Sequence, residues 1–347
     1  MLIISILEKL MLQQQSITGG NTRLKIITWH IHGSYLYYLS QGNYDLYIPV
    51  KDDRSEGYYG RGETFPFGPN VHVVPADKVR ELDFDCILFQ SARNYLTDQF
   101  EILSAEQREL PKIYLEHDPP RQTPTDTKHI VDDPEVLLVH VTHFNQLMWD
   151  NNRCPTHVID HGVLVPQVEY SGELDRGIVV INNIQKRGRR LGLDVFLELR
   201  KHVPLDLIGM GSEELGLGEV KHGDLPAFIS KYRFFFNPIR YTSLGLSILE
   251  TMMIGIPVVG LATTELVTVI QNGVSGYIHT DTNYLAERMT ELIRDPEMAT
   301  KLGREGQKVV QERFNINRFA RDWESTFNIV IKEARSKKSA IRLGANV

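Results

Sequence analysis

Glu250 and the five residues at 242–246 have types and a spacing that could perform recognisable chemistry. The five residues join an apolar run at 234–237 to a helical pattern that begins near residue 246. A loop that turns into a helix presents unpaired backbone N–H groups and the positive end of the helix dipole, so it can hold a diphosphate. Glu250 follows by about one helical turn, where its carboxylate can accept both hydroxyls of an attached ribose. A solvent-facing glutamate is the competing interpretation, and the chemistry alone favours neither. The residues of this diphosphate cradle are Thr242, Ser243, Leu244, Gly245 and Leu246.

Two buried strands and a helix must position the cradle. The pattern predicts strands at 234–237 and 256–259, with a helix at 246–254 between them. Gly255 ends the helix, and Pro257 prevents it from continuing. Apolar residues recur at helical spacing over a wide arc, so we expect this helix to pack against a sheet.

The rest of the chain alternates apolar runs with helical patterns. We expect further strands at 24–29, 44–50, 71–74, 85–90, 113–115, 136–141, 158–163, 177–181 and 205–208. We expect further helices at 94–110, 145–149, 193–201, 284–293 and 296–313. An apolar residue at every fourth position predicts a long stripe on a last helix, formed by Phe319, Trp323, Phe327 and Ile331.

The run LGLSILETMMIGIPVVGLATTELVTVIQNGVSGYI resembles the donor-site segment of the GT-B glycosyltransferases, in particular the large retaining family 4. That family has the pattern E-G-F-G-L-x-x-x-E-A-M-A-x-G-x-P-V-V, then a Glu, then D-G-x-x-G. The positions that agree in order and spacing are Gly245, Leu246, Glu250, Met252, Gly255, Pro257, Val258, Val259, Glu265, Gly273 and Gly276. The family's first paired glutamate, which faces the donor sugar, falls at Thr242.

The resemblance implies an α/β protein of the GT-B class. In that class two Rossmann-like domains face each other across a cleft, and a C-terminal helix crosses back to the first domain. It implies transfer of a sugar from a nucleoside diphosphate sugar to an acceptor hydroxyl, with retention of anomeric configuration, in glycan or glycolipid synthesis. The acceptor would be a carbohydrate, a lipid-linked molecule or a small molecule. No obligatory metal and no cofactor besides the nucleotide sugar are implied.

The resemblance also assigns residues to the donor diphosphate and base. In the family motif G-R-x-x-x-x-K-G, the Arg and Lys reach the diphosphate. Arg187 with Gly188 aligns with K-G here, and Asn183 or Asn182 occupies the place of the Arg. Arg187 and the amides of residues 243–246 would neutralise the departing diphosphate. Lys221 and His222 follow the pattern of the loop that grips the base.

The first half of the chain supplies three further groups of candidates. His117 directly follows a predicted strand, and ligands of doubly wound sheets sit at the carboxyl ends of strands. Relatives carry a histidine there that faces the donor sugar, whereas a structural hydrogen-bonding histidine is the plainer interpretation. Glu116 and Asp118 are candidates for the acceptor pocket, and Gly33 matches the glycine turn that closes over the diphosphate.

Composition narrows the class of protein. The chain has 347 residues, 42% hydrophobic and 24% charged, which suits a globular protein of two domains. Its net charge of −6 gives no basic field, so we expect no nucleic-acid partner. The two cysteines lack metal spacing, which predicts no structural metal site and suits a cytoplasmic protein. His30 and His32 lie close together but have no evident third ligand, so we expect no metal there either. Peripheral contact with a membrane and the oligomeric state stay open.

The predicted domains are an extension at 1–22, a Rossmann-like acceptor domain at 23–165, a Rossmann-like donor domain at 166–316, a crossover helix at 317–335 and a solvated tail at 336–347. The extension could be a loosely attached helix or one that rests on a membrane.

Three rival functions remain. A GT-B epimerase fits the donor motifs, and a phosphorylase would need a lysine motif for pyridoxal phosphate that we do not find. Thr242 and the missing arginine favour a catalytically weak GT-B subunit that binds nucleotide or a partner.

Overall fold

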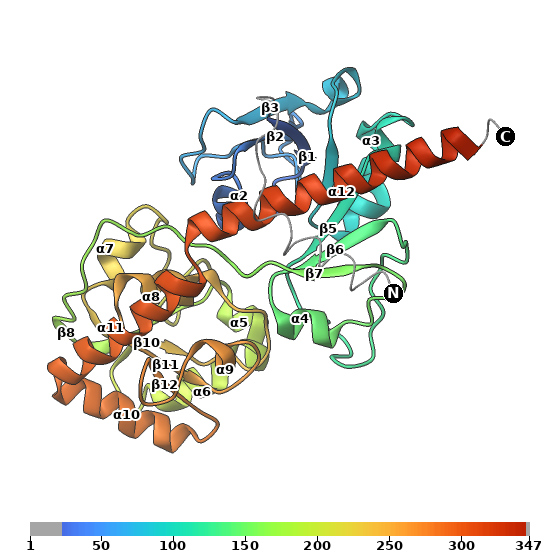
Figure 1. Ribbon diagram of the computed structural model, residues 1–347. Helices are drawn as coiled ribbons and strands as arrows, with labels where there is room; N and C mark the ends of the chain where they lie inside the picture. The colour runs from blue at the N-terminus through green and yellow to red at the C-terminus, as the bar shows by residue number, and fades with distance from the viewer. Residues whose placement is uncertain (1–22, 345–347) are drawn as a thin grey trace. The chain divides into compact units, whose positions relative to one another are not determined.

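The computed structural model describes residues 23–344, which form two compact units (Figure 1). Unit 1 comprises residues 23–160 and 316–344, and unit 2 comprises residues 161–315. The domain boundaries expected from the sequence lie at 165 and 316. The expected extension at 1–22 lies outside the described residues. Within the described part of the chain, every helix is too short or too polar to cross a membrane.

Unit 1 is built on seven parallel strands in the order β3-β2-β1-β4-β5-β6-β7. Their bounds are β1 (Leu24–Thr28), β2 (Tyr44–Val50), β3 (Val71–Pro75), β4 (Cys86–Phe89), β5 (Lys112–Glu116), β6 (Val136–His140) and β7 (Thr156–Val158). The first six confirm predicted strands. The strand predicted at 158–163 is wrong, because β6 pairs only as far as His140 with Val158, and the chain beyond has no neighbouring strand to extend.

Unit 2 is built on five parallel strands in the order β12-β11-β10-β8-β9. Their bounds are β8 (Leu174–Val180), β9 (Leu205–Ile208), β10 (Tyr232–Asn237), β11 (Val258–Leu261) and β12 (Tyr277–His279). Strand β11 starts two residues later than predicted, since Pro257 has no N–H to donate to the ladder and contributes only its carbonyl, to Phe235.

Both sheets have the doubly wound strand order, which marks one position in each where a ligand can bind. In unit 1 the strand order reverses between β1 and β4, and in unit 2 it reverses between β8 and β10. Ligands of such sheets bind outside the carboxyl ends of the strands at this switch point. In unit 2 the segments there are 181–192, after β8, and 238–245, after β10.

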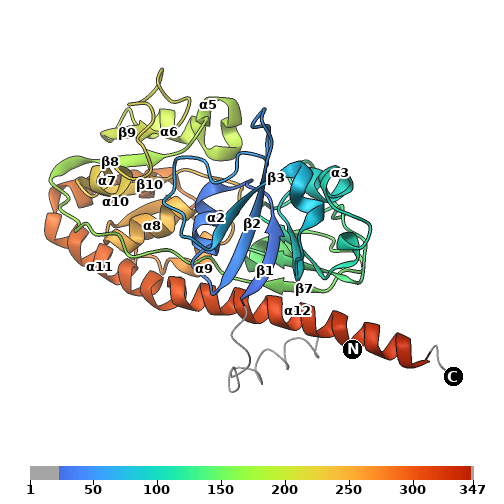
Figure 2. The ribbon, with the colours of Figure 1, turned by 90° about the horizontal axis from the view of Figure 1, so that it is seen from above.

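Helices cover the sheets of both units (Figures 1 and 2). In unit 1 they are α2 (Gly33–Leu39), α3 (Gln99–Ile102), α4 (His143–Met148) and α12 (Ile316–Gly344). In unit 2 they are α5 (Ile184–Arg187), α6 (Leu193–Leu199), α7 (Leu225–Ile229), α8 (Leu246–Ile254), α9 (Leu266–Val269), α10 (Thr282–Arg294) and α11 (Pro296–Arg313). The predicted helices at 193–201, 246–254, 284–293 and 296–313 are confirmed, and Thr142 caps α4 by accepting a hydrogen bond from the amide of Asn145.

The helix predicted at 94–110 is confirmed only in its first part, because the helical stretch ends at Ile102 and a separate turn follows. A π-helical turn at Asn94–Asp98 runs into α3, and a 3₁₀ turn follows at Gln107–Glu109. Ser104 Oγ accepts from the amide of Gln107, and the Gln107 side chain accepts from the amide of Ser104. This reciprocal pair is a capping box, which starts a new helical turn and interrupts the preceding one.

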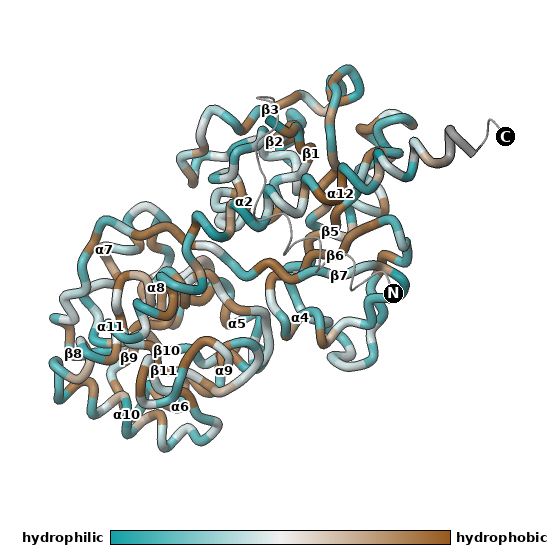
Figure 3. The backbone as a smooth tube through the Cα atoms, in the orientation of Figure 1, coloured by the Kyte–Doolittle hydropathy of each residue, from teal (hydrophilic) through white to brown (hydrophobic). Residues whose placement is uncertain are grey.

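Helix α8 lies in an apolar setting, as its sequence predicts. Six of its nine residues are buried, and the apolar colouring of Figure 3 gathers on α8, β10 and β11. The helix ends at Gly255, whose φ of 92° lies in the left-handed region. Because the helix is held on the sheet by these contacts, the direction of its amino end is fixed.

Helix α12 returns the chain to unit 1 and packs there by the predicted stripe (Figures 1 and 2). Phe319, Trp323 and Phe327 are fully buried, and the Trp323 indole donates to the Tyr35 hydroxyl at 3.1 Å. The helix continues to Gly344, so residues 336–344, which we expected to be a tail, are helical.

Burial of His140 gives unit 1 a pH-dependent stability. Burial lowers the pKa of His140 to about 4, whereas an unfolded histidine has a pKa of about 6.5. Between these values the unfolded chain binds a proton that the folded chain does not, so the free energy of unfolding falls as the pH falls. We predict that urea denaturation will show wild type losing about 2 kcal/mol more than His140→Gln between pH 7 and pH 5. Parallel losses in the two proteins would contradict this assignment.

Candidate functional site

The amino end of α8 lies at the switch point of unit 2 and has no side-chain cap. Its N-cap is Gly245, with φ −74° and ψ 135°, so no side chain can accept the first-turn N–H groups. Ser243 is buried, and its hydroxyl has no hydrogen-bond partner among the residues that the structure describes. A buried polar group without a partner costs about 1–3 kcal/mol, so this arrangement is suited to an anion that accepts from it.

Glu250 lies on the half-exposed face of α8. The three residues of the helix that are not fully buried are Leu246, Ser247 and Glu250. At 100° per residue these three fall within an arc of about 100°, so Glu250 shares a face with the first turn. The structure therefore brings the cradle and Glu250 together on one side of one helix.

His161 contacts the backbone of the cradle at Leu244. Its buried ring donates from Nε2 to the carbonyl oxygen of Leu244 at 3.0 Å. A carbonyl oxygen only accepts, so this contact requires hydrogen on Nε2. The contact fixes the orientation of the Leu244 peptide, and with it the approach of the chain to α8.

The segment after β8 carries the other predicted donor residues. Asn183 is exposed, with a left-handed φ of 53°, and its amide donates to the carbonyl of Met210 at 2.7 Å. The neighbouring Asn182 accepts from the amide of Met210 at 2.9 Å, so this turn is fixed to the turn after β9. Arg187 is half-buried at the end of α5, and Gly188 follows it with a φ of 56°.

Lys221 and His222 lie in the turn that precedes α7. The Lys221 carbonyl accepts from the amides of Asp224 and Leu225, each at 3.0 Å, while its side chain is exposed and His222 is half-buried. The two residues stay predicted base contacts.

His117 lies beside the switch point of unit 1 with a defined tautomer. Gln90 donates from Nε2 to the Trp29 carbonyl at 2.8 Å and to the Thr28 hydroxyl at 2.9 Å. These contacts turn Gln90 Oε1 toward His117, whose Nε2 lies 3.3 Å away and must donate. The ring of His32 lies 4.1 Å from that of His117. Gly33 begins α2, where an added Cβ would lie 2.7 Å from the Phe65 ring.

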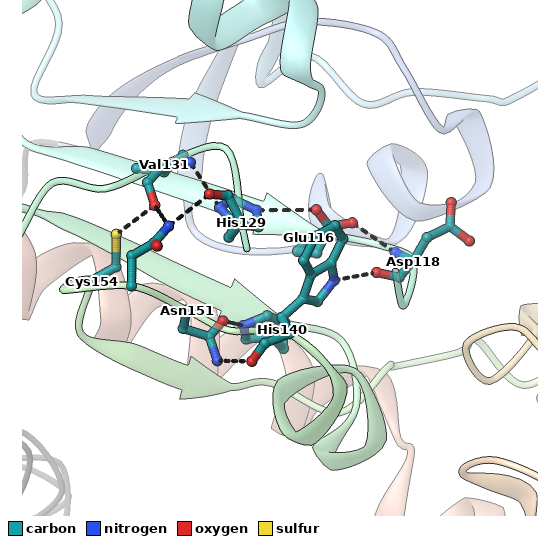
Figure 4. Close-up of polar contacts among 9 residues, drawn as sticks. Glu116, Asp118, His129, Val131, His140, Asn151 and Cys154 are labelled. Atoms are coloured by element: carbon teal, nitrogen blue, oxygen red, sulfur yellow. Dashed lines mark hydrogen bonds and ion pairs between the residues drawn. The ribbon is translucent and has the colours of Figure 1, made fainter. Parts of the chain in front are cut away.

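Glu116 and Asp118, the predicted acceptor residues, already make contacts within unit 1 (Figure 4). One oxygen of Glu116 accepts from the Asp118 amide at 2.9 Å, and the other lies 3.2 Å from Nε2 of the buried His129. The Asp118 carboxylate pairs with Arg121, and the Trp149 indole donates to the Asp118 carbonyl at 2.8 Å. These contacts hold the backbone on the carboxyl side of His117, and the acceptor role of both carboxylates stays a prediction.

Four residues that fix these candidates were not predicted from the sequence as site residues. They are Gln90, His129, Trp149 and His161. The first is the last residue of the strand predicted at 85–90 and directly follows the observed strand β4 at a switch point, which is a signal that sequence reasoning could have used. The other three act across 13 to 83 positions of the chain, and no local pattern indicates such contacts.

Comparison with known proteins finds similar sequences and similar structures. Residues 215–309, which contain the cradle and Glu250, match the family described as Glycosyl transferases group 1. The chain is 20% identical over 229 residues to N-acetyl-alpha-D-glucosaminyl L-malate synthase of Bacillus anthracis, covering 65% of this chain and 53% of that protein. It is 26% identical over 121 residues to the capsular polysaccharide biosynthesis glycosyltransferase CapM of Staphylococcus aureus, covering 34% and 32% of the two chains. The chain thus spans about half the length, or less, of these curated relatives.

Solved structures share the fold. A sucrose-phosphate synthase from Thermosynechococcus elongatus superposes with a TM-score of 0.68 at 14% identity, covering 90% of this chain and all of that one. HepE of Anabaena, in complex with UDP and glucose, gives a TM-score of 0.66 at 14% identity, covering 88% of this chain and all of that one. The fold is therefore that of the GT-B glycosyltransferases.

The Gln90 contact predicts the tautomer of His117. In wild type, nitrogen-15 NMR of histidine-labelled protein should show His117 protonated at Nε2 whenever the ring is neutral. Gln90→Met removes the acceptor and should let the other tautomer populate, whereas Gln107→Met, at a buried glutamine that contacts Val79 and Leu82, should leave His117 unchanged. A wild-type ring protonated mainly at Nδ1 would refute this orientation.

Proposed function

We propose that the chain is a retaining, family 4 type glycosyltransferase that moves a sugar from a nucleoside diphosphate sugar to an acceptor hydroxyl. The observation that carries the proposal is the uncapped amino end of α8 with the buried Ser243 hydroxyl, at the switch point and inside the segment that matches the family. A helix start of this kind offers several donors to an anion without a compensating side chain.

The donor diphosphate would rest on the amides of residues 243–246, with Arg187 and the turn at Asn183 beside it. The bond from the sugar's anomeric carbon to the diphosphate breaks while a bond to the acceptor oxygen forms, and the proton of the acceptor hydroxyl passes to an oxygen of the departing diphosphate. The departing diphosphate keeps the electron pair, so the helix amides and the Arg187 guanidinium stabilise the charge that develops. Glu250 would orient the ribose and His117 the sugar, without an obligatory metal.

UDP is the nucleotide that we propose. HepE and the pneumococcal O-GlcNAc transferase GtfA, both similar in fold, were each solved with UDP and a sugar. The names of the curated relatives describe a malate-glucosaminyl product and capsular polysaccharide. We therefore propose a carbohydrate or small-molecule hydroxyl as the acceptor, with lipid-linked molecules as the third class.

Thr242 supports the second candidate function, a GT-B subunit that binds nucleotide with little turnover. A threonine supplies no carboxylate where the family has the glutamate that faces the donor sugar. Turnover separates the two candidates. Purified protein should release UDP from at least one sugar in a panel of UDP-sugars, tested with and without hydroxyl acceptors. Binding of UDP without transfer or hydrolysis of any sugar would favour the subunit.

Glu250→Ala should weaken UDP binding by at least about tenfold, because a carboxylate that accepts charge-assisted hydrogen bonds contributes about 1.5–3 kcal/mol. Isothermal titration calorimetry on the full chain measures the effect. Glu287→Ala removes an exposed glutamate from α10 of the same unit and should leave the affinity unchanged. Equal UDP affinity in Glu250→Ala and wild type would remove Glu250 from the site.

A further inference from the structure

Arg240, in the segment 238–245 at the switch point of unit 2, pairs with Asp194 in the first turn of α6, just after the segment 181–192. Arg240 donates from its two terminal nitrogens to both carboxylate oxygens of Asp194, at 2.5 and 2.9 Å. The guanidinium also donates to the carbonyl of Arg189 at 2.8 Å. The fork geometry of a guanidinium on a carboxylate fixes both the distance and the relative orientation of the two groups.

The backbones of the same two segments are bonded as well. The amides of Arg240 and Tyr241 both donate to the carbonyl of Arg190, at 3.1 and 3.2 Å. Gly192 lies against Pro238 so closely that an added Cβ would come within 1.9 Å of the Pro238 carbonyl oxygen. The segment after β8 and the segment after β10 therefore form one packed layer.

In the sequence, the residues of this layer lie between the predicted diphosphate contacts, which are Arg187 and the cradle. Arg187 precedes Arg189 by two positions, and Thr242 directly follows Tyr241, which leads into the cradle. Hydrogen bonds from Arg240 hold the pKa of Asp194 below its ordinary value, so the carboxylate stays ionised at neutral pH. Both side chains are about one-third exposed, at 33% and 37%, and such a pair contributes little to folding stability.

We propose that Arg240 and Asp194 are positioning residues that set the distance between Arg187 and the cradle, and so the affinity for the donor diphosphate. The proposal rests on the proposed function and deepens it. Neither residue needs to touch the nucleotide. Their contacts determine whether the cradle amides and the Arg187 guanidinium can bind the same diphosphate. A displacement of about 1 Å between these groups would weaken that binding.

The competing role for Arg240 is that of a direct phosphate ligand, and Asp194→Asn separates the two roles. The substitution keeps the shape of the side chain but removes the charge that holds Arg240. A positioning pair predicts weaker UDP binding, by about tenfold, because the arginine is no longer fixed. A direct ligand predicts tighter binding, because the arginine is released from a competing carboxylate.

The test is calorimetric titration of UDP into the full chain, as wild type, Asp194→Asn, Arg240→Gln and the double variant. We expect each single variant to weaken binding by about tenfold. The double variant should bind no more weakly than Asp194→Asn, which already breaks the contact with Arg240 and also loses the ion pair of Asp194 with Arg189. The KM for the nucleotide sugar should rise in proportion, and the KM for the acceptor should not, which a general loss of structure would not produce.

Arg176→Gln is the matched control. Nη1 of Arg176 in β8 donates to both carboxylate oxygens of Asp206 in β9, at 3.1 Å each, in the same sheet but toward its amino edge. This variant should keep wild-type UDP affinity. Unchanged or tighter binding in Asp194→Asn, or equal weakening in Arg176→Gln, would overturn the positioning role while wild type still binds UDP. Wild type that binds no UDP and no nucleotide sugar would overturn the proposed function, and the positioning role with it.

Discussion

The candidate site of unit 2 depends on one structural constraint, which is that the amino end of α8 has no side-chain cap. The buried face of α8 holds the helix on the sheet. The positive end of the helix dipole therefore lies at the switch point between β8 and β10. Gly245 offers no cap, and the Ser243 hydroxyl is buried without a partner among the described residues. A buried hydroxyl without a partner costs free energy, and an anion that accepts from Ser243 and from the helix amides would recover it. His161, Arg240 and Asp194 add the contacts that keep these donors in place.

Unit 1 also places polar groups at the switch point of its sheet, but these groups differ chemically from those of unit 2. The switch point of unit 1 presents the imidazole rings of His32 and His117 rather than helix amides, and the His117 ring is oriented by a hydrogen bond to the buried Gln90. Glu116 accepts from the Asp118 amide (Figure 4), and the Trp149 indole donates to the Asp118 carbonyl. One unit thus carries groups suited to an anion, and the other carries groups suited to hydroxyls and protons.

The sequence predicted the elements whose signal is local. Apolar runs located β1, β2 and β10, and the glycine at 255 located the end of α8 almost to the residue. It failed where a competing local interaction wins, as at Ser104 and Gln107, whose capping box breaks the helix predicted at 94–110. It could not indicate contacts such as that of His161 with Leu244, which join positions 83 residues apart through the folded sheet. For the same reason the role of Asp194 became visible only from its contact with Arg240.

Hydrogen exchange followed by mass spectrometry, with and without UDP, tests the central claim most directly. If the diphosphate accepts hydrogen bonds from the start of α8, UDP will slow exchange in peptides that cover residues 243–248. Saturating UDP that protects other parts of unit 2 and leaves those amides exchanging at the unbound rate would contradict the account.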